Sequence, residues 1–168
     1  SDIQSDLSLF SSNEKIDNDN TVTLFKENLI MLLPKNHPLA GARQVKLTDF
    51  ADDKFITAPK GMWLRSTTDQ LCYAAGFEPS IVMESDNPNT VREFIRAGLG
   101  VAIVPQLTWY AARGEGVESL FLQDDNCYRY LNLSWRTDAP LPLVAVLLQE
   151  YIIDNFWSFV ESTANLNK

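Results

Sequence analysis

The 168-residue sequence is poor in the residue types on which much protein chemistry depends. It has one histidine and two cysteines, and its basic residues form no cluster. Lys and Arg total 14 against 22 Asp and Glu, so the formal net charge is −8. Because a chain of that charge repels a phosphate backbone, we expect these residues not to bind nucleic acid directly.

The scarcity of cysteine argues against a disulfide framework and against a zinc site. Cys72 and Cys127 are far apart in the sequence, and neither lies in a CxxC motif or beside a histidine. This usage is typical of reduced thiols in a cytosolic protein. The opening residues, "SDIQSDLS", are neither basic nor apolar, so we expect no secretory leader and a cytoplasmic location.

Motifs for catalysis are missing as well. His37, in "KNHPLA", stands next to a proline and is better suited to a turn than to the role of a base. The sequence has no G-x-S-x-G motif and no second histidine to activate a hydroxyl. Asp52 and Asp53, like Asp124 and Asp125, are adjacent acids expected on solvated turns, not as metal ligands. The sequence therefore predicts no enzyme, no metal site and no cofactor.

Long uninterrupted apolar runs are also absent. The longest apolar stretch, "LVAVLLQEYIIDNFWSFV", contains Gln149, Glu150, Asp154 and Asn155. A membrane span needs about 20 predominantly apolar residues, so this stretch predicts a buried helix and no membrane partner.

The residues that are present predict a globular α/β protein. Hydrophobic residues make up 45% of the chain and aromatic residues 11%, enough for a core. We predict strands over 6–10, 54–58, 80–85, 101–104, 117–122 and 128–135, and one or two strands over 22–34. We also predict a loop over 11–20, a helical turn over 46–50, and helices over 64–75, 90–97, 106–113 and 141–162. Because strands and helices alternate through the middle of the chain, this order predicts a layered structure with a mostly parallel sheet.

The stretch "AGLGVAIVP" (97–105) has two glycines between a predicted helix and a predicted strand. A phosphate-binding glycine loop instead follows a strand and opens a helix, and it needs three glycines. We expect Gly98 to end the helix in a left-handed conformation. "VAIV" is then a short strand buried on both faces of the sheet.

Two predicted helices begin in segments suited to binding a small anion. "APKGMWLRSTTD" leaves a strand and enters a helix, which places free N–H groups and the positive end of the helix dipole at the carboxyl edge of the sheet. Met62 and Trp63 would offer apolar surface there. Alternatively, Trp63 and Leu64 fasten the helix start to the core. "DNPNT" repeats the arrangement with Asn87 and Asn89, and two such helix starts favour a carboxylate ligand.

Arg65, in the first of these helices, has two possible roles. It can contact the ligand, or it can form an ion pair with Asp69. The spacing of four residues places the two side chains on one helix face and favours the ion pair.

Four ordered motifs resemble the effector-binding domain of LysR-type transcriptional regulators. They are "ENLIMLLPKNHPLA", "VKLTDFADDKFI", "LRSTTDQLCYAAGFEPSIVMES" and "VREFIRAGLGVAIVP". The resemblance covers nearly the whole chain. It implies an α/β fold like that of type 2 periplasmic binding proteins, with two Rossmann-like subdomains joined by crossover strands and a small-molecule effector in the cleft between them.

The resemblance also implies a division of the chain. Residues 1–26 would be the remnant of the first subdomain and a crossover, 27–133 the second subdomain, and 134–168 the return crossover and a C-terminal helix packing on the first subdomain. We expect the family's winged helix–turn–helix and first β-α-β stretch to be absent, which leaves the first subdomain incomplete. The full-length protein would bind DNA through that absent N-terminal domain as a homo-oligomer, a dimer or tetramer. A chain lacking the β-α-β stretch would expose apolar surface and a free sheet edge, which favour self-association.

Candidate effector-binding residues follow from the same resemblance. On the first-subdomain or hinge side they are Leu9, Phe10, Ser11 and Phe25. On the second-subdomain side they are Met62, Trp63, Leu64, Asn87, Asn89 and Val101. Family members often have a small hydroxyl residue at the position of Trp63, where a tryptophan would shrink the pocket or favour a flat apolar partner. The alternative function on this fold is a free-standing solute-binding protein of a transporter.

Overall fold

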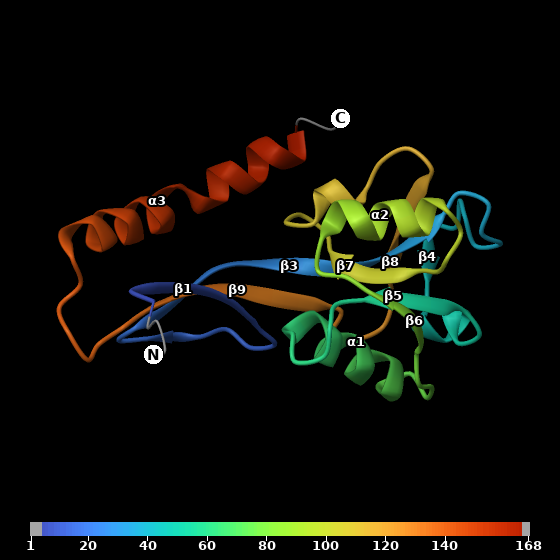
Figure 1. The fold of residues 1–168 in the computed structure, drawn as a ribbon, viewed down its shortest axis with the longest axis horizontal. Helices are drawn as coiled ribbons and strands as arrows, with labels where there is room; N and C mark the ends of the chain where they lie inside the picture. The colour runs from blue at the N-terminus through green and yellow to red at the C-terminus, as the bar shows by residue number, and fades with distance from the viewer. Residues whose placement is uncertain (1–4, 166–168) are drawn as a thin grey trace. The chain divides into compact units, whose positions relative to one another are not determined.

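The computed structural model describes residues 5–165 (Figure 1). Its contacts divide the chain into two compact units. Unit 1 consists of the described residues up to Glu27 and from Tyr128 onward, and unit 2 of Asn28–Cys127. The chain therefore passes between the units twice. Strand 128–135 belongs to unit 1, whereas the sequence-based division kept residues up to 133 in the second subdomain.

Unit 1 is built on antiparallel strands. β1 (Leu7–Ser12) pairs with β9 (Tyr128–Trp135), and β9 lies next to β3 (Thr21–Pro34). The short β2 (Asp17–Asn18) pairs with the start of β3. The prediction of a loop over 11–20 is therefore wrong for Ser11 and Ser12, which belong to β1, and for the two residues of β2. Thr23 Oγ1 lies 2.9 Å from the Ile16 nitrogen and 2.8 Å from the Ile16 oxygen, which holds this polar segment against β3.

The sheet of unit 2 is mixed. The second half of β3 runs antiparallel to β7 (Ala102–Pro105) and to β8 (Val117–Leu122), while β4 (Gln44–Val45) runs parallel to β8. β5 (Lys54–Thr57) and β6 (Ser80–Glu84) form a parallel pair, and a parallel bridge joins Phe55 to Val101. The expectation of a mostly parallel sheet is wrong, because the 14-residue β3 pairs antiparallel with β2 in unit 1 and with β7 and β8 in unit 2.

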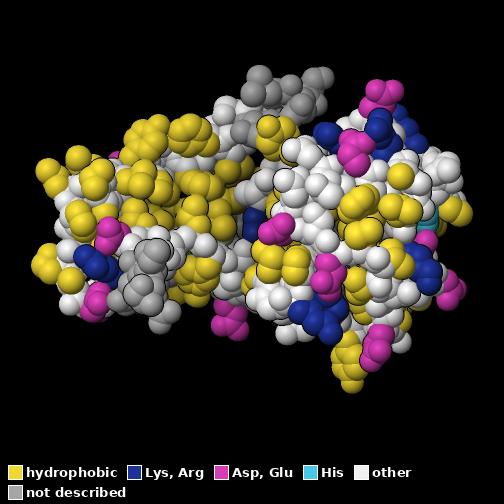
Figure 2. Space-filling model, viewed as in Figure 1, with side chains coloured by type: hydrophobic (Ala, Val, Ile, Leu, Met, Phe, Trp, Pro, Cys, Tyr) yellow, Lys and Arg dark blue, Asp and Glu magenta, His cyan; other side chains and the backbone are white. Residues whose placement is uncertain are grey.

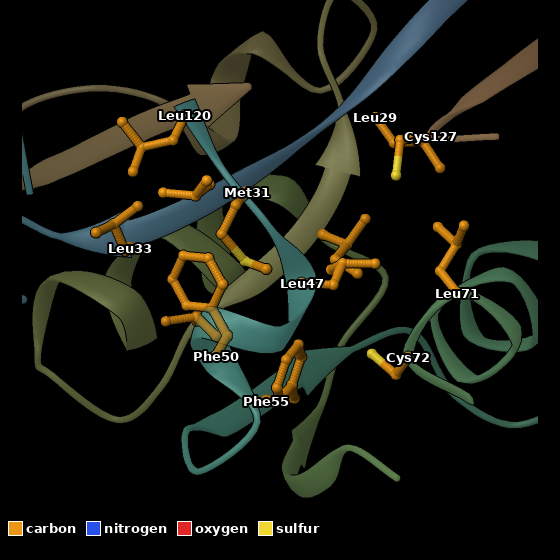
Figure 3. Packing of buried hydrophobic residues seen from close by; sticks show 13 residues of the cluster. Leu29, Met31, Leu33, Leu47, Phe50, Phe55, Leu71, Cys72, Leu120 and Cys127 are labelled. Atoms are coloured by element: carbon orange, nitrogen blue, oxygen red, sulfur yellow. The ribbon is translucent and has the colours of Figure 1, made fainter. Parts of the chain in front are cut away.

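Helices cover both faces of this sheet. Alternate side chains of β3 point to opposite faces, as the pleat requires. Leu29, Met31 and Leu33 join a cluster with Leu71 and Cys72 of α1 (Trp63–Ala74), as Figure 3 shows. Ile30 and Leu32 join a second cluster with Val91 and Ile95 of α2 (Pro88–Arg96). The "VAIV" segment contributes side chains to both clusters, Val101 and Ile103 to the first and Ala102 and Val104 to the second. Its predicted burial on two faces is confirmed.

Two further helical predictions have different outcomes. The turn predicted over 46–50 is the 3-10 helix η1 (Leu47–Phe50), with both terminal apolar side chains fully buried. The helix predicted over 106–113 is wrong, since only the three-residue η2 (Tyr110–Ala112) forms there. The Gln106 N–H instead donates to the Asn28 carbonyl, and the following Thr108, Trp109 and Tyr110 are weak helix formers.

The C-terminal helix α3 (Leu143–Asn165) differs from its prediction. Among its described side chains only Ala145 and Val160 are buried, so the expectation of a buried helix is wrong. Figure 2 shows hydrophobic side chains gathered over this helix. Its segment Leu143–Ser162 is also long and apolar enough to cross a membrane by length and composition, a test that core helices of soluble proteins pass as well.

Candidate functional site

The candidate site of unit 2 lies where two neighbouring strands end. β5 and β6 are parallel, and Thr57 lies opposite Glu84 at their carboxyl ends. The Ser85 N–H donates to the Thr57 carbonyl at 2.9 Å and holds these ends together. The chain leaves β5 to enter α1 and leaves β6 to enter α2. Both helix N-termini therefore follow the same edge of the β5–β6 sheet, as the sequence predicts.

The start of α1 is open. Met62 is its N-cap residue and makes no side-chain capping hydrogen bond, and the first turn contains no acid. Met62 is 40% exposed, whereas Trp63 packs against the core cluster and Leu64 is buried. Trp63 and Leu64 thus have the contacts that fasten a helix start, and Met62 is the side chain available at the surface.

The start of α2 is capped by Asn87. Its side-chain oxygen accepts a hydrogen bond from the Thr90 N–H at 3.1 Å, an N-cap signalled by the "NPNT" sequence. Pro88 and Asn89 take the first helical positions, as predicted, and Asn89 is exposed. Val101 is 1% exposed and belongs to the core cluster, so its side chain faces the core.

Arg65 is held by two carboxylates. Its Nε lies 3.0 Å from Asp69 Oδ2, which confirms the favoured ion pair, and its Nη1 also contacts Glu84 of β6. Burial lowers the Arg65 pKa, but hydrogen bonds to Glu84 and Asp69 outweigh it, so that the pKa is raised. With both carboxylates engaged, this guanidinium is neutralised within unit 2.

A cavity of about 450 Å³ lies along α1 and β6. Arg65, Asp69, Tyr73 and Ile81 are among its lining residues. The first turns of α1 and α2 do not line it beyond Arg65, so it is separate from the helix starts described above.

The predicted residues of unit 1 lie in different environments. Leu9 is 52% exposed, while Phe10 and Ser11 are half-buried on the same strand. Phe25 is buried, and its ring stacks on Phe156 of α3 with centroids 5.5 Å apart. Phe25 therefore packs α3 against the sheet of unit 1.

Sequence reasoning missed a buried ion pair in unit 1. Arg129 of β9 donates from Nε to Glu27 Oε1 of β3 at 2.8 Å, and its Nη2 lies 2.7 Å from the same oxygen. Its Nη1 donates to Ser11 Oγ at 2.6 Å. The available signal was the register of Glu27, which shares the parity of Phe25 and Leu29 and therefore the inward face of the strand.

His37 and Asp124, which the sequence analysis considered as candidate site residues, form hydrogen bonds that stabilise turns. His37 lies in a turn, where its Nδ1 accepts from the Leu39 N–H and its Nε2 pairs with Asp53 Oδ1, both at 3.1 Å. Asp124 accepts from the Leu47 N–H at 2.8 Å and so holds the start of η1. Within residues 5–165, no group of three His, Cys, Asp or Glu side chains is placed to hold a metal ion.

The two cysteines are free thiols buried in the core of unit 2, in agreement with the prediction of reduced thiols (Figure 3). Burial raises the pKa of Cys72 and of Cys127 to about 12. Because the thiolate is the reactive form, neither side chain is a nucleophile near neutral pH.

Two α/β-containing units joined by two chain crossings, with helix starts at one sheet edge, define the class of type 2 periplasmic-binding-protein-like ligand-binding domains. The profile of the family described as the LysR substrate binding domain matches residues 4–157. The chain belongs to this family and is an effector-binding domain of the LysR type.

Relatives in sequence are transcriptional regulators. The HTH-type transcriptional regulator YybE of Bacillus subtilis (strain 168) is 30% identical over 135 residues, which cover 80% of this chain and 46% of YybE. The transcriptional dual regulator GltC of the same organism is 36% identical over 86 residues, covering 51% of this chain and 29% of GltC. The chain thus spans less than half the length of these curated relatives. Because both relatives are described as transcriptional regulators, the transporter alternative is not favoured.

Solved structures share the fold. The CcmR regulatory domain of Synechocystis PCC6803 in complex with 2-PG has a TM-score of 0.76 at 18% identity, covering 90% of this chain and 73% of that one. The effector-binding domain of QuiR in complex with shikimate has a TM-score of 0.75 at 20% identity, covering 89% and 70%.

Proposed function

We propose that this domain binds a small carboxylate or related anion and thereby controls transcription by a longer, cytoplasmic, homo-oligomeric LysR-type regulator. DNA would be bound by another part of that regulator, in keeping with the formal charge of −8 on this chain. The domain itself would catalyse no reaction and need no cofactor or metal. An effector that binds one arrangement of the domain better than another would shift the population toward it.

One observation carries the choice of an anion. α1 and α2 begin at the same edge of the β5–β6 sheet, and neither has an acid in its first turn. The positive ends of two helices are therefore left without a carboxylate from their own first turns, and such ends stabilise a bound anion. The solved complexes with 2-PG and shikimate support small ligands for domains of this fold.

The proposed contacts are those of unit 2. They are the exposed Met62 side chain, the first-turn N–H groups of α1, Asn89, and the amide nitrogen of Asn87, whose oxygen is used as a cap. Trp63, Leu64 and Val101 would shape the wall of the unit 2 site from the core side, as their packing indicates. For unit 1 the family resemblance separately predicts Leu9, Phe10, Ser11 and Phe25 as effector-binding residues.

The test is a titration of the 168-residue chain with an acid panel of shikimate, benzoate, L-glutamate, citrate and inorganic phosphate, followed by calorimetry and thermal unfolding. We expect at least one acid to bind saturably and to raise the melting temperature. Asn89→Asp places a negative charge at the start of α2, so it should weaken that binding about ten-fold.

Gln70→Glu is the matched control, because it adds the same charge to an exposed position in the middle of α1. It should leave the affinity within about two-fold of the unsubstituted chain. Equal losses in the two variants would contradict a site at the helix starts. Absence of saturable binding by every acid of the panel would contradict the proposed function.

A further inference from the structure

We propose that Arg65 determines the charge selectivity of the site at the helix starts of unit 2, because it neutralises the Glu84 carboxylate, which would otherwise repel an anion there. This inference rests on the proposed function and assigns a specificity-determining residue to it. Arg65 acts through Glu84 and does not itself contact the effector.

Glu84 lies at the edge of the sheet where the anion would bind. It is the last residue of β6, and it lies opposite Thr57, the last residue of β5. The chain enters α1 after β5 and α2 after β6, so this carboxylate belongs to the same edge as the two helix starts. Its side chain is 43% exposed and therefore accessible to a ligand. An uncompensated carboxylate at this edge would oppose the anion that the helix dipoles attract.

Arg65 is placed to compensate for this acid. It is the third residue of α1, and its side chain is only 11% exposed. Its Nη1 contacts Glu84 Oε1, while its Nε lies 3.0 Å from Asp69 Oδ2. The guanidinium thus joins the first turn of α1 to the carboxyl end of β6, as well as to the next turn of its own helix.

This position is unfavourable for an arginine as far as the helix alone is concerned. A cation in the first turn opposes the positive end of the helix dipole, and burying a guanidinium costs solvation free energy. Packing already holds α1 in place, since Leu71 and Cys72 join the same core cluster as residues of β3. Holding the helix therefore gives no sufficient reason for a charge here, whereas neutralising the acid at the sheet edge does.

The other charged groups near the helix starts provide no substitute. The loop from β5 to α1 contains Lys60, and the loop from β6 to α2 contains Asp86. Both are exposed, and their opposite charges balance. Without Arg65, the negative charges of Glu84 and Asp69 would be offset by no cation of these two loops or of the first turns of α1 and α2.

The experiment asks whether affinity follows the charge at this edge or the contact between Arg65 and Glu84. Calorimetric titrations use the acids of the panel that bind the unsubstituted 168-residue chain. Arg65→Gln leaves Glu84 without its cation, so we expect about ten-fold weaker binding. Glu84→Gln removes the acid and keeps the cation, so we expect about three-fold tighter binding. The double variant Arg65→Gln, Glu84→Gln has the charge of the unsubstituted chain and should bind within about two-fold of it.

Two further variants serve as controls. Arg65→Lys keeps the charge and loses the planar fork, so its affinity should stay within about three-fold of that of the unsubstituted chain. Arg96→Gln is the matched control, because Arg96 also pairs with a glutamate, Glu93, but in the last turn of α2. This substitution removes the same charge away from the helix starts and should change the affinity less than about two-fold. Thermal unfolding selects a titration temperature at which every variant is folded.

The dependence on charge and salt tests the electrostatic origin of the effect. Among the acids that bind, the loss of affinity in Arg65→Gln should grow with the charge of the acid. It should also shrink when the ionic strength is raised from about 0.02 M to about 0.3 M, because exposed charges are screened. A loss caused by displacement of α1 would not depend on the charge of the acid in this way.

A purely structural role of Arg65 predicts a different order of affinities. If Arg65 only held α1 to β6, Glu84→Gln would bind no more tightly than the unsubstituted chain, and the double variant no more tightly than Arg65→Gln. Either result overturns this inference and leaves the proposed function standing. Failure of every acid to bind the unsubstituted chain overturns the proposed function and the inference with it.

Discussion

At the scale of single residues, the two glycines of "AGLGVAIVP" are needed for different reasons, Gly98 for its backbone conformation and Gly100 for its lack of a side chain. Gly98 has a φ of +77°, and its N–H and that of Leu99 donate back to Ile95 and Phe94, which closes α2 in the expected left-handed cap. Gly100 is needed for space. A Cβ there would lie 2.4 Å from the Lys54 carbonyl oxygen, because the backbone next to it hydrogen-bonds to β5.

This difference predicts the effect of two substitutions. Gly100→Ala should lower the free energy of unfolding by about 1–3 kcal/mol, because β5 must move away from the new methyl group. Gly98→Asn is the control in the same stretch. A Cβ built at Gly98 would have no neighbouring atom within 4 Å, and asparagine tolerates the left-handed conformation. We therefore expect this substitution to lower the free energy of unfolding by only a few tenths of a kcal/mol, that is, roughly 0.3 kcal/mol. Urea unfolding of both variants measures the difference, and equal losses would contradict the steric explanation.

The residues that sequence reasoning missed are those with distant partners. The Arg65–Asp69 pair was predictable from a spacing of four, but the contact of Arg65 with Glu84 spans 19 residues and that of Arg129 with Glu27 spans 102. Helical periodicity fixes which side chains meet within a turn. No local rule fixes which strands become neighbours, so the polar network of unit 1 could not be located from the sequence.

At the scale of elements, local signals predicted α1 and α2, and they predicted one or two strands where the single β3 forms. Gly76 has a φ of +93° just beyond α1, and Asn87 and Pro88 start α2, so glycine and capping residues marked these boundaries well. Strand direction was predicted poorly. Alternation of helices and strands favours parallel neighbours, but β3 pairs antiparallel with β7 and with β8. The sequence also could not show that α3 leaves its apolar residues exposed.

The exposure of α3 predicts the behaviour of the chain in solution. Leu143, Val144, Leu147, Leu148 and Tyr151 are each between 49% and 75% exposed on this helix. Contiguous apolar surface of this kind drives association in water. We therefore expect the 168-residue chain to self-associate as its concentration rises, and Leu147→Glu with Tyr151→Glu to shift it toward the monomer.

Sedimentation velocity over a hundred-fold range of concentration measures this effect. The charge-matched control is Thr48→Glu with Ser66→Glu, at two exposed positions of unit 2. It should self-associate like the unsubstituted chain. A monomer at every concentration for the unsubstituted chain would show that α3 does not drive association.

At the scale of the whole molecule, the core of unit 2 links stability to pH through its thiols. Cys72 and Cys127 belong to the same hydrophobic cluster, which also contains residues of β3, η1 and α1. Burial is the main reason that both pKa values are raised, and nearby carboxylates, Asp69 for Cys72 and Asp124 for Cys127, add to it. Ionising either thiol would place a charge among apolar side chains, so deprotonation must be coupled to unfolding.

The sign of this coupling follows from the two pKa values. Each thiol has an ordinary pKa of 9.0 and a folded pKa of about 12, so between these pH values the folded chain holds protons that the unfolded chain has released. The contribution to stability is fully present below pH 9 and is lost as the pH rises toward 12.

Urea unfolding under reducing conditions at pH 7.5, 9.5 and 10.5 should therefore show a falling free energy of unfolding. The Cys72→Ala, Cys127→Ala double variant should start lower, because of the cavities it leaves, but fall less steeply. Lysines and tyrosines titrate in both proteins, so their effects cancel in the comparison. If the free energy of unfolding fell with pH at the same rate in both proteins, the thiols would ionise without unfolding the core.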